Sequence, residues 1–321
     1  MRVTNNMFVN KFTRSINSAA SNMDAIGEQV YTGMKFSKAS EDTAGALKAF
    51  KIRRSIARTE QYRNNIRDIQ GTYDEIESTL MGISDILSQA KDSLIQAVNG
   101  TMSEENRQVT ANIIKSLQDQ IFKLGNTNFA GKYIFGGPNT VTPPFTIDSG
   151  KLFYNGEDMD NASVSTEQIY ADIGLGLAFD VSGQPLAHSA LPVGIPGSQI
   201  LGYGIDENGF SNNIYNLFSQ IVTSLQNNDM SQMEQYLQKL SQKFDTILVE
   251  VAGIGERCNF IEFLDDRLSL DELNLKNKQN SVESVDEAEA IMHYKMAEMT
   301  YKAALQMGSK MLELSLLDFL R

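Results

Sequence analysis

The chain has 321 residues, of which 41% are hydrophobic and 21% are charged, and its formal net charge is −12. This length allows more than one packed domain, and the acidic balance makes nucleic acid a poor partner for the chain as a whole. A single cysteine, Cys258, excludes an intramolecular disulfide and a cysteine zinc cluster. No apolar run approaches the roughly 18 residues of a membrane span, so we expect no membrane insertion.

The N-terminus and the charge distribution bear on localisation and self-association. Residues 1–6 lack the hydrophobic core of a signal peptide, so composition alone predicts a cytoplasmic protein, and any export needs a route without a cleaved signal. Residues 1–70 hold 12 Lys and Arg against 6 Asp and Glu, a net of +6, which leaves −18 for the remainder. A basic start on an acidic body favours self-association, although a solvated helix face explains it equally well.

The first predicted helix precedes Gly33 and is amphipathic. Its apolar residues recur at helical spacing and are Phe8, Phe12, Ile16, Ala19, Met23, Ile26 and Val30. An isolated terminal helix is marginal because the burial of a few apolar side chains barely offsets the entropy of ordering its backbone. We therefore expect both ends of the chain to become ordered only when they pack against neighbouring subunits.

Residues 66–97 carry the strongest helical pattern. Their apolar residues follow the 3.5-residue repeat of a coiled-coil seam and are Ile66, Ile69, Tyr73, Ile76, Leu80, Ile83, Leu87, Ala90, Leu94 and Ala97. Asn99-Gly100 predicts the end of this helix, and residues 101–104 resemble a capping box that begins another. That second helix is expected to end at Gly125, and its predicted stripe is Val109, Ile113, Leu117, Ile121 and Leu124.

The region 136–210 has a different composition. All six prolines lie between Pro138 and Pro196, and proline breaks helix interiors. Segments 145–147, 151–154 and 162–166 have strand-like composition, and they are bounded by turn signals at 148–150 and 155–156. We predict a small β-rich insert whose glycines and weak apolar content argue against a deep ligand pocket.

A second long seam follows the insert and matches the first in length. It is interrupted at Asp265 and consists of Met230, Met233, Leu237, Leu240, Phe244, Ile247, Val251, Ile254, Cys258, Ile261 and Leu268. We interpret the two seams as antiparallel partners in one rod-like bundle.

The last predicted helix begins at residues 284–287, which resemble a capping box. Its stripe is Met292, Met296, Met299, Ala303, Met307, Met311 and Leu314. A buried core and a surface that packs against several partners explain this methionine stripe equally well.

No motif for catalysis or metal binding is complete. Residues 125–133 resemble a phosphate loop, but they have one residue too many between the glycines, and Tyr133 replaces the required Ser or Thr. His188 and His293 lie far apart in the sequence without partner motifs, and Cys258 occupies a seam position where a small apolar residue packs well. We therefore predict no enzyme, no cofactor and no metal site.

A run of basic residues lies in the first arm and consists of Lys51, Arg53, Arg54, Arg58, Arg63 and Arg67. Only Tyr62 accompanies it as an aromatic residue for base stacking, and no recognition motif is present. We interpret the run as an exposed helical face or as a subunit-contact surface, and we disfavour nucleic acid binding.

Several segments resemble the flagellin superfamily, and among its members they are most similar to the hook-associated proteins of the hook–filament junction. The resemblance covers residues 1–137 and 211–321 and fades in the insert. The matching segments are 2–7, 32–45, 61–66, 97–101, 126–137, 301–304 and 315–321. Thr43 departs from the superfamily pattern, which has proline there.

The resemblance implies a mainly α fold, a flagellin-like bundle of paired terminal arms with a small β-rich insert. The expected divisions are an assembly and export segment at 1–45, the two halves of a helical rod at 46–135 and 211–280, the insert between them at 136–210, and a final assembly helix at 281–321. The predicted subunit-contact residues are Phe8, Phe12, Ile16, Met23, Ile26, Val30, Met292, Met296, Met299, Met307, Met311, Leu314, Leu317, Phe319 and Leu320.

The resemblance also implies a structural role in the bacterial flagellum. The expected partners are copies of the chain in a ring, the hook-side junction protein, flagellin, and an export chaperone that binds the C-terminal region. Export would use the flagellar type III apparatus, which delivers the protein outside the cell without signal cleavage. A filament flagellin is the alternative within the superfamily, and a coiled-coil signalling or nucleic-acid-binding protein is the alternative outside it.

Overall fold

The structure is a computed structural model that describes residues 5–98, 103–161, 163–181, 183, 185–186 and 189–319. It forms two compact units, one of residues 1–60 with 270–321 and one of residues 61–269. The helices are α1 (Asn5–Thr32), α2 (Thr43–Val98), α3 (Glu104–Gly125), α4 (Gly197–Leu201), α5 (Ile214–Gln226), α6 (Met233–Glu283) and α7 (Glu287–Phe319). The strands are β1 (Asn128–Phe129), β2 (Lys132–Tyr133), β3 (Phe145–Asp148), β4 (Lys151–Tyr154), β5 (Glu157–Asp158), β6 (Tyr170–Ala171) and β7 (Leu191–Pro192).

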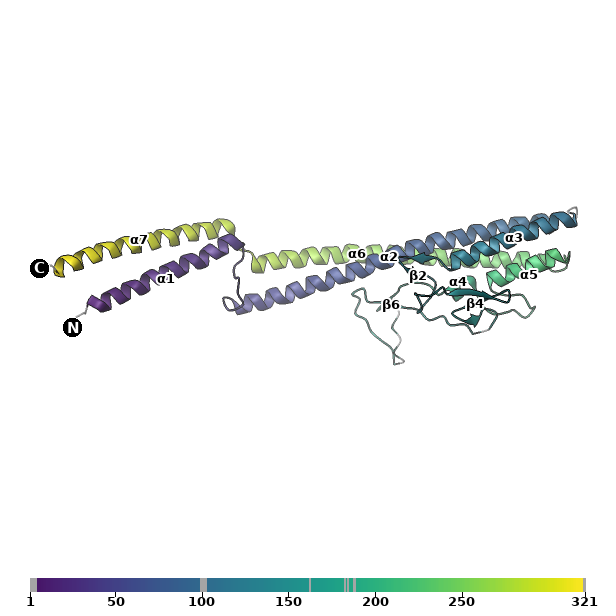
Figure 1. Cartoon of the computed structure of the whole chain (residues 1–321), viewed down its shortest axis with the longest axis horizontal. Coiled ribbons are helices and arrows are strands. Elements are labelled where there is room, and N and C mark those ends of the chain that lie inside the picture. The colour runs from purple at the N-terminus through teal and green to yellow at the C-terminus, as the bar shows by residue number, and fades with distance from the viewer. Residues whose placement is uncertain are drawn as a thin grey trace. The chain divides into compact units, whose positions relative to one another are not determined.

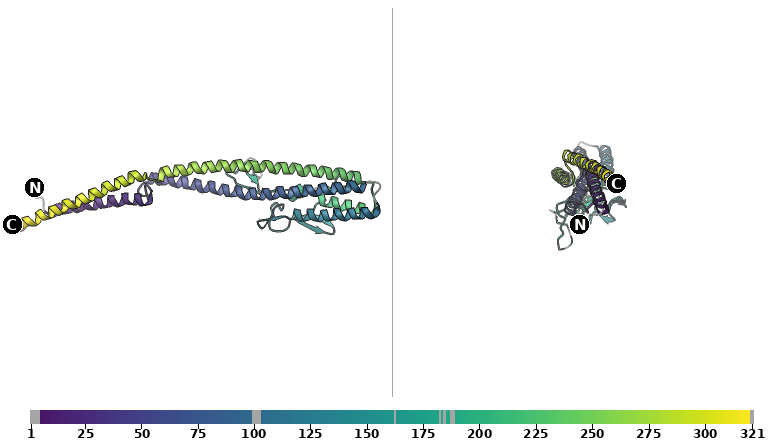
Figure 2. Two further views of the ribbon diagram at one scale, coloured as in Figure 1. Left: turned by 90° about the horizontal axis from the view of Figure 1, so that it is seen from above. Right: turned by 90° about the vertical axis from the view of Figure 1, so that its left-hand side faces the viewer.

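The unit 61–269 is built on the two predicted seams. Within it α2 and α6 lie side by side (Figures 1 and 2), and every predicted seam residue of α2 from Ile66 to Ala97 is buried. Lys91 Nζ donates to Ser241 Oγ at 3.3 Å, whereas Arg63 Nε lies 2.8 Å from Asp265 Oδ1. Because the residue numbers of the two helices run in opposite senses across these contacts, the helices are antiparallel, as predicted.

The predicted interruption of the α6 seam at Asp265 is wrong. Leu264 fills the turn between Ile261 and Leu268, and it is 3% exposed within the hydrophobic core. The half-buried Asp265 instead pairs through its carboxylate with the half-buried guanidinium of Arg63. A charge near the core is tolerated when it is paired and hydrogen-bonded.

α3 differs from the predicted pattern at its start and along its buried face. Ser103, not Thr101, caps the helix, because the Ser103 hydroxyl accepts from Asn106 N at 3.3 Å. Thr101 and the predicted stop at Asn99-Gly100 lie outside the described residues. The predicted end at Gly125 is confirmed.

The predicted stripe of α3 is wrong at Val109 and Ile113, which are 57% and 45% exposed. The helix instead buries Ala111, Ile114 and Gln118. The Gln118 amide donates to Tyr215 O at 2.9 Å and to Ser219 Oγ at 2.5 Å, both on α5. A pattern based on hydrophobicity misses this face, because the face includes the small residue Ala111 and the polar residue Gln118, whose side-chain amide is hydrogen-bonded.

The insert contains two of the three predicted strands, and its core is continuous with that of the helices. β3 pairs antiparallel with β4, and β4 with β5. Residues at both tight turns have positive φ, with Ser149 at 50° and Gly150 at 83°, and Asn155 at 49° and Gly156 at 88°. Such dihedrals favour two-residue hairpins. The third prediction is wrong, because residues 163–166 pair with no strand.

The other unit contains the paired terminal helices α1 and α7. Gly27 of α1 faces the Tyr294 ring, and Gly308 of α7 faces the Phe12 ring. These two contacts join late α1 to early α7 and early α1 to late α7, so the helices are antiparallel. Both glycines are buried, and the absence of a side chain lets the helices approach closely.

The capping residue of α7 is Asp286 and not Ser284. The Asp286 carboxylate accepts from Ala288 N at 3.0 Å and Glu289 N at 3.2 Å. Ser284 forms an isolated antiparallel bridge with Met34. Asp is among the residues that cap helix N-termini best, and its charge also favours that end of the helix dipole.

Candidate functional site

The predicted contact residues of α1 lie half-buried along one side of the helix. These residues are Phe12, Ile16, Met23, Ile26 and Val30. Ala19 and Ile26 line a small cavity together with Met296 and Ala297 of α7. The side chain of Phe8 lies outside the described part. This stripe therefore contributes to the intramolecular pairing with α7, and its role in subunit contact stays a prediction.

α7 packs on α1 through a face that sequence reasoning missed. Its buried and half-buried residues recur at three- and four-residue intervals and are Ala290, Tyr294, Ala297, Tyr301, Ala304 and Gly308. This is the 3.5-residue repeat of a helix-pairing seam. Alanine and glycine carry little hydrophobic signal, so the methionine stripe dominated the pattern. The regular spacing of Ala, Tyr and Gly was the signal that could have revealed this face.

The methionine stripe lies outside the centre of the face that packs on α1. At about 100° per residue, Met292 and Met299 lie opposite the Ala290–Gly308 face, whereas Met296 and Met307 lie on its flank, and Met296 also lines the cavity shared with α1. These four residues are 46–65% exposed, so the core interpretation is wrong for them. We call this set the methionine face. The side chains of Met311, Leu314, Leu317 and Phe319, and all of Leu320, lie outside the described part.

Further apolar side chains are exposed on the same helix pair. Met7 and Val9 of α1 and Ile291 and Leu305 of α7 are each between 44% and 64% exposed. Single exposed apolar residues are ordinary, but contiguous ones mark interaction surfaces. Flexible thioether side chains adapt to different neighbours. The terminal helix pair thus leaves apolar side chains of both helices uncovered.

The end of α6 is anchored by a buried carboxylate, which positions the start of α7. Glu283 is 5% exposed, and its Oε2 accepts from Arg53 Nη2 and from Gln279 Nε2, both at 2.9 Å. Arg53 Nε lies 2.8 Å from Oε1, an ion pair without the alignment of a hydrogen bond. Burial opposes ionisation, but the hydrogen bonds from Arg53 and Gln279 outweigh it and lower the Glu283 pKa.

The backbone of the same segment holds the loop after α1. Lys35 N donates to Glu283 O at 2.7 Å, and Val285 N donates to Gly33 O at 2.9 Å. Gly33 has a φ of 67°, which favours glycine. Asp42 then caps α2 by accepting from Ala44 N and Gly45 N. The terminal pair is therefore fixed, within its own unit, to the beginning of α2 and the end of α6.

The basic run of α2 forms a face opposite the buried side of the helix. Lys51, Arg54 and Arg58 are exposed and form no ion pair within the described residues, and Leu47 and Phe50 beside them are 58% and 68% exposed. We call these five residues the basic face. Two other residues of the run are engaged, since Arg53 binds Glu283 and Arg63 binds Asp265.

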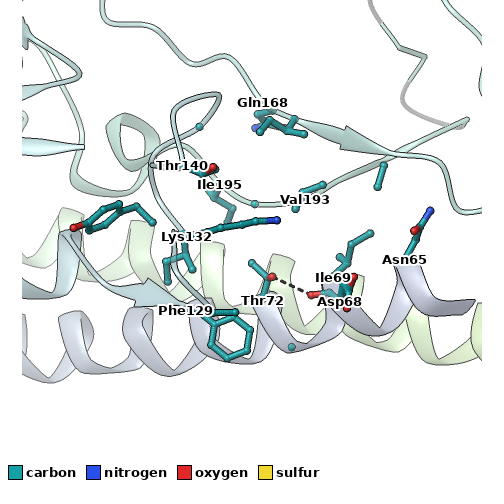
Figure 3. Close-up of a pocket in the computed structure, with 18 of the residues that line it drawn as sticks. Asn65, Asp68, Ile69, Thr72, Phe129, Lys132, Thr140, Gln168, Val193 and Ile195 are labelled. Atoms are coloured by element: carbon teal, nitrogen blue, oxygen red, sulfur yellow. Dashed lines mark hydrogen bonds between the residues drawn. The ribbon is translucent and has the colours of Figure 1, made fainter. Parts of the chain in front are cut away.

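A pocket of about 650 Å³ lies within the unit 61–269, where the insert meets α2. Ile69 and Thr72 of α2 lie on one side, and Val193 and Ile195 lie on the other (Figure 3). Lys132 extends between them. Glycines form part of the pocket lining, at Gly71, Gly137 and Gly194. Gly71, for example, faces the Phe129 ring.

The remaining candidate groups are dispersed. His293 is exposed and lies 3.4 Å from Glu289 on the same helix, whereas His188 lies outside the described residues. Cys258 is half-buried on the α6 seam, and burial raises the pKa of its thiol. Within the described ranges, no group of three or more His, Cys, Asp or Glu side chains is placed to hold a metal ion. No helix in those ranges is long and apolar enough to span a membrane.

Known proteins resemble the chain in sequence and in fold. Residues 3–140 match the family described as the bacterial flagellin N-terminal helical region. The chain is 22% identical over 328 aligned positions to flagellar hook-associated protein 3 of Escherichia coli strain K12, with 98% of each protein covered.

Two solved structures share the fold. A putative flagellar hook-associated protein from Vibrio parahaemolyticus aligns with a TM-score of 0.63 at 19% identity, covering 76% of this chain and 100% of that one. The flagellar junction protein FlgL from Legionella pneumophila aligns with a TM-score of 0.55 at 14% identity, covering 74% of this chain and 100% of that one. Residues 3–140 thus match a flagellin N-terminal helical region, and the whole chain resembles flagellar hook-associated protein 3 in sequence.

Proposed function

We propose that the protein is a structural adaptor at the hook–filament junction of the bacterial flagellum. In this role it self-associates into a ring and connects the hook-side junction protein to flagellin. The observation that carries the proposal is the exposed methionine face of α7, on the terminal helix pair of a chain that is similar over its whole length to a hook-associated protein. The name of the Legionella protein, a flagellar junction protein, supports the location.

The adaptor uses the two sides of α7 differently. The Ala290–Gly308 face holds α1, and the methionine face contacts neighbouring subunits. Thioether side chains suit an adaptor, because its neighbours on the hook side and the filament side are different proteins. The predicted contact residues at the C-terminal end, from Met311 to Leu320, extend this surface. Assembly supplies the neighbours that cover the exposed apolar side chains.

Delivery follows from the same assignment. The chain reaches the extracellular tip of the hook through the flagellar type III apparatus without signal cleavage. Before export, a dedicated chaperone covers the C-terminal region and keeps its apolar side chains from aggregating in the cytoplasm.

A deletion strain tests the proposal. Cells that lack the gene should make hooks without filaments and should release flagellin into the medium, and both defects should disappear when the gene is restored. Electron microscopy of hook tips and immunoblotting of the medium measure these outcomes. Normal filaments in the deletion strain would refute the adaptor role. Hooks with filaments composed of another flagellin would also contradict it.

A further inference from the structure

The outer side of α6 carries an exposed face that takes no part in the core of the unit 61–269. Asp245, Val249, Glu256, Phe260 and Phe263 lie within one strip opposite the buried seam, by helical periodicity of about 100° per residue. The strip is exposed, with Val249 at 69% and Phe263 at 63%. Its two carboxylates form no ion pair within the described residues. We call it the acidic face.

The acidic face of α6 and the basic face of α2 both combine apolar and charged residues, and their charges have opposite signs. Each combines large apolar residues with charges that form no ion pair in the described part of the chain. The basic face has three cations around Leu47 and Phe50, whereas the acidic face has two carboxylates around Val249, Phe260 and Phe263. Opposite charges arranged around apolar side chains set specificity and speed in protein association.

We propose that the basic face of one copy binds the acidic face of a second copy. The inference rests on the self-association proposed above and names the surfaces that mediate it. The two faces are different surfaces, so the contact is heterologous and leaves one free face of each kind on every pair. Such a contact repeats from copy to copy, and it forms a closed ring when the rotation between copies closes.

The charge distribution of the chain favours a second copy of the chain as the partner of the basic face. Residues 1–70 have a net charge of +6 and residues 71–321 have −18, so copies attract one another when the basic segment of one meets the acidic helix of the next. Nucleic acid is disfavoured as the partner, because the chain as a whole has a net charge of −12 and carries no nucleic-acid recognition motif. The basic face combines cations with exposed Leu47 and Phe50, and a helix surface that combines opposite charge with apolar side chains complements both properties.

Charge reversal tests the pairing. One variant carries Arg54→Glu and Arg58→Glu, and the other carries Asp245→Lys and Glu256→Lys. Sedimentation velocity of the full chain should show a loss of at least about tenfold in association for each variant alone. Wild-type association should weaken as salt rises, because salt screens exposed charges. A control with Lys115→Glu and Lys123→Glu, on exposed residues of α3, makes the same charge change elsewhere and should associate like wild type.

Mixing the two variants is the decisive step. In the mixture, each reversed face meets a face of opposite sign on the other variant, so association should return to near the wild-type level. Circular dichroism confirms that each variant is folded. Wild-type association in both single variants, or no recovery in the mixture, overturns the pairing while the adaptor role stands. A wild-type chain that stays monomeric at every concentration overturns the self-association on which the pairing rests.

Discussion

Arg53 of α2 and Glu283 at the end of α6 form an ion pair, with Nε 2.8 Å from Oε1, although 230 residues separate them in the sequence. The carboxylate is buried and the guanidinium is largely exposed. Glu283 also carries the backbone contact to Lys35, so one residue joins the start of α2, the loop after α1 and the last turn of α6.

Glu283→Gln should destabilise the unit that contains the terminal helices by roughly 1–2 kcal/mol at neutral pH, because a charge-assisted contact to a partly exposed partner is lost. The folded-state pKa of Glu283 lies below the usual 4.5. Its stabilising contribution is therefore present above the unfolded pKa and is lost as the pH falls through the folded value. Thermal melts from pH 7 down to pH 3 should show that wild type loses stability as the pH falls and that the variant loses less. An identical pH profile in both would contradict the account, and Glu262→Gln on exposed α6 is the control.

Lys243→Met should stabilise the unit 61–269. Burial, with a smaller contribution from Lys239, lowers the Lys243 pKa to about 8. Between pH 8 and 10.5 the folded chain therefore binds fewer protons than the unfolded chain, and wild-type stability rises with pH across this window. The free energy of unfolding of the variant should be about 1–3 kcal/mol higher than that of wild type at pH 7. The variant should not show the rise in stability between pH 8 and 10.5. Urea unfolding at pH 7 and pH 10 measures both effects, and Lys115→Met at an exposed site should change neither.

Gly308→Leu should separate the terminal helices. A Cβ at Gly308 would clash with the Phe12 ring, whereas a Cβ at Gly253 of α6 meets no atom within 4 Å. The Gly308 variant should lose hydrogen-exchange protection in α1 and α7, although leucine favours helix formation more than glycine does. Gly253→Leu should retain wild-type protection. Equal protection in both variants would show that close approach at Gly308 does not determine the pairing.

Replacing Met292, Met296 and Met299 with glutamine should block assembly without unfolding the chain. These side chains are exposed, so their loss should change the free energy of unfolding by less than about 0.5 kcal/mol. Complementation of the deletion strain should nevertheless fail to restore filaments. A control triple variant replaces Met81, Ile95 and Val109, which are similarly exposed, and should restore them. Filament recovery with both variants would remove the methionine face from the proposed contact surface.

The long seams could be predicted from the sequence because they bury large aliphatic residues at a regular interval. The regularity from Ile66 to Ala97 leaves one buried side of α2, and the structure buries every member. The strands 145–147 and 151–154 were predictable because their turn residues require positive φ, which the structure adopts.

The seam of α7 could not be recognised by hydrophobicity, because Ala290, Ala297 and Gly308 are small and the adjacent methionines are larger and more apolar. Caps were misplaced at Thr101 and Ser284 because several residues near each helix start can accept a backbone hydrogen bond, and tertiary contacts select one of them. The Arg53–Glu283 pair was also hidden, since sequence spacing carries no information about contacts between distant segments.

Removal of residues 312–321 tests the central claim most directly, since it deletes the predicted C-terminal contacts and leaves the two long seams intact. Purified truncated protein should retain the helical content and unfolding midpoint of the unit 61–269. Electron microscopy of the deletion strain that expresses it should show hooks without filaments. A folded truncated protein that still yields hooks with normal filaments would contradict the claim that the terminal helices join this protein to its neighbours.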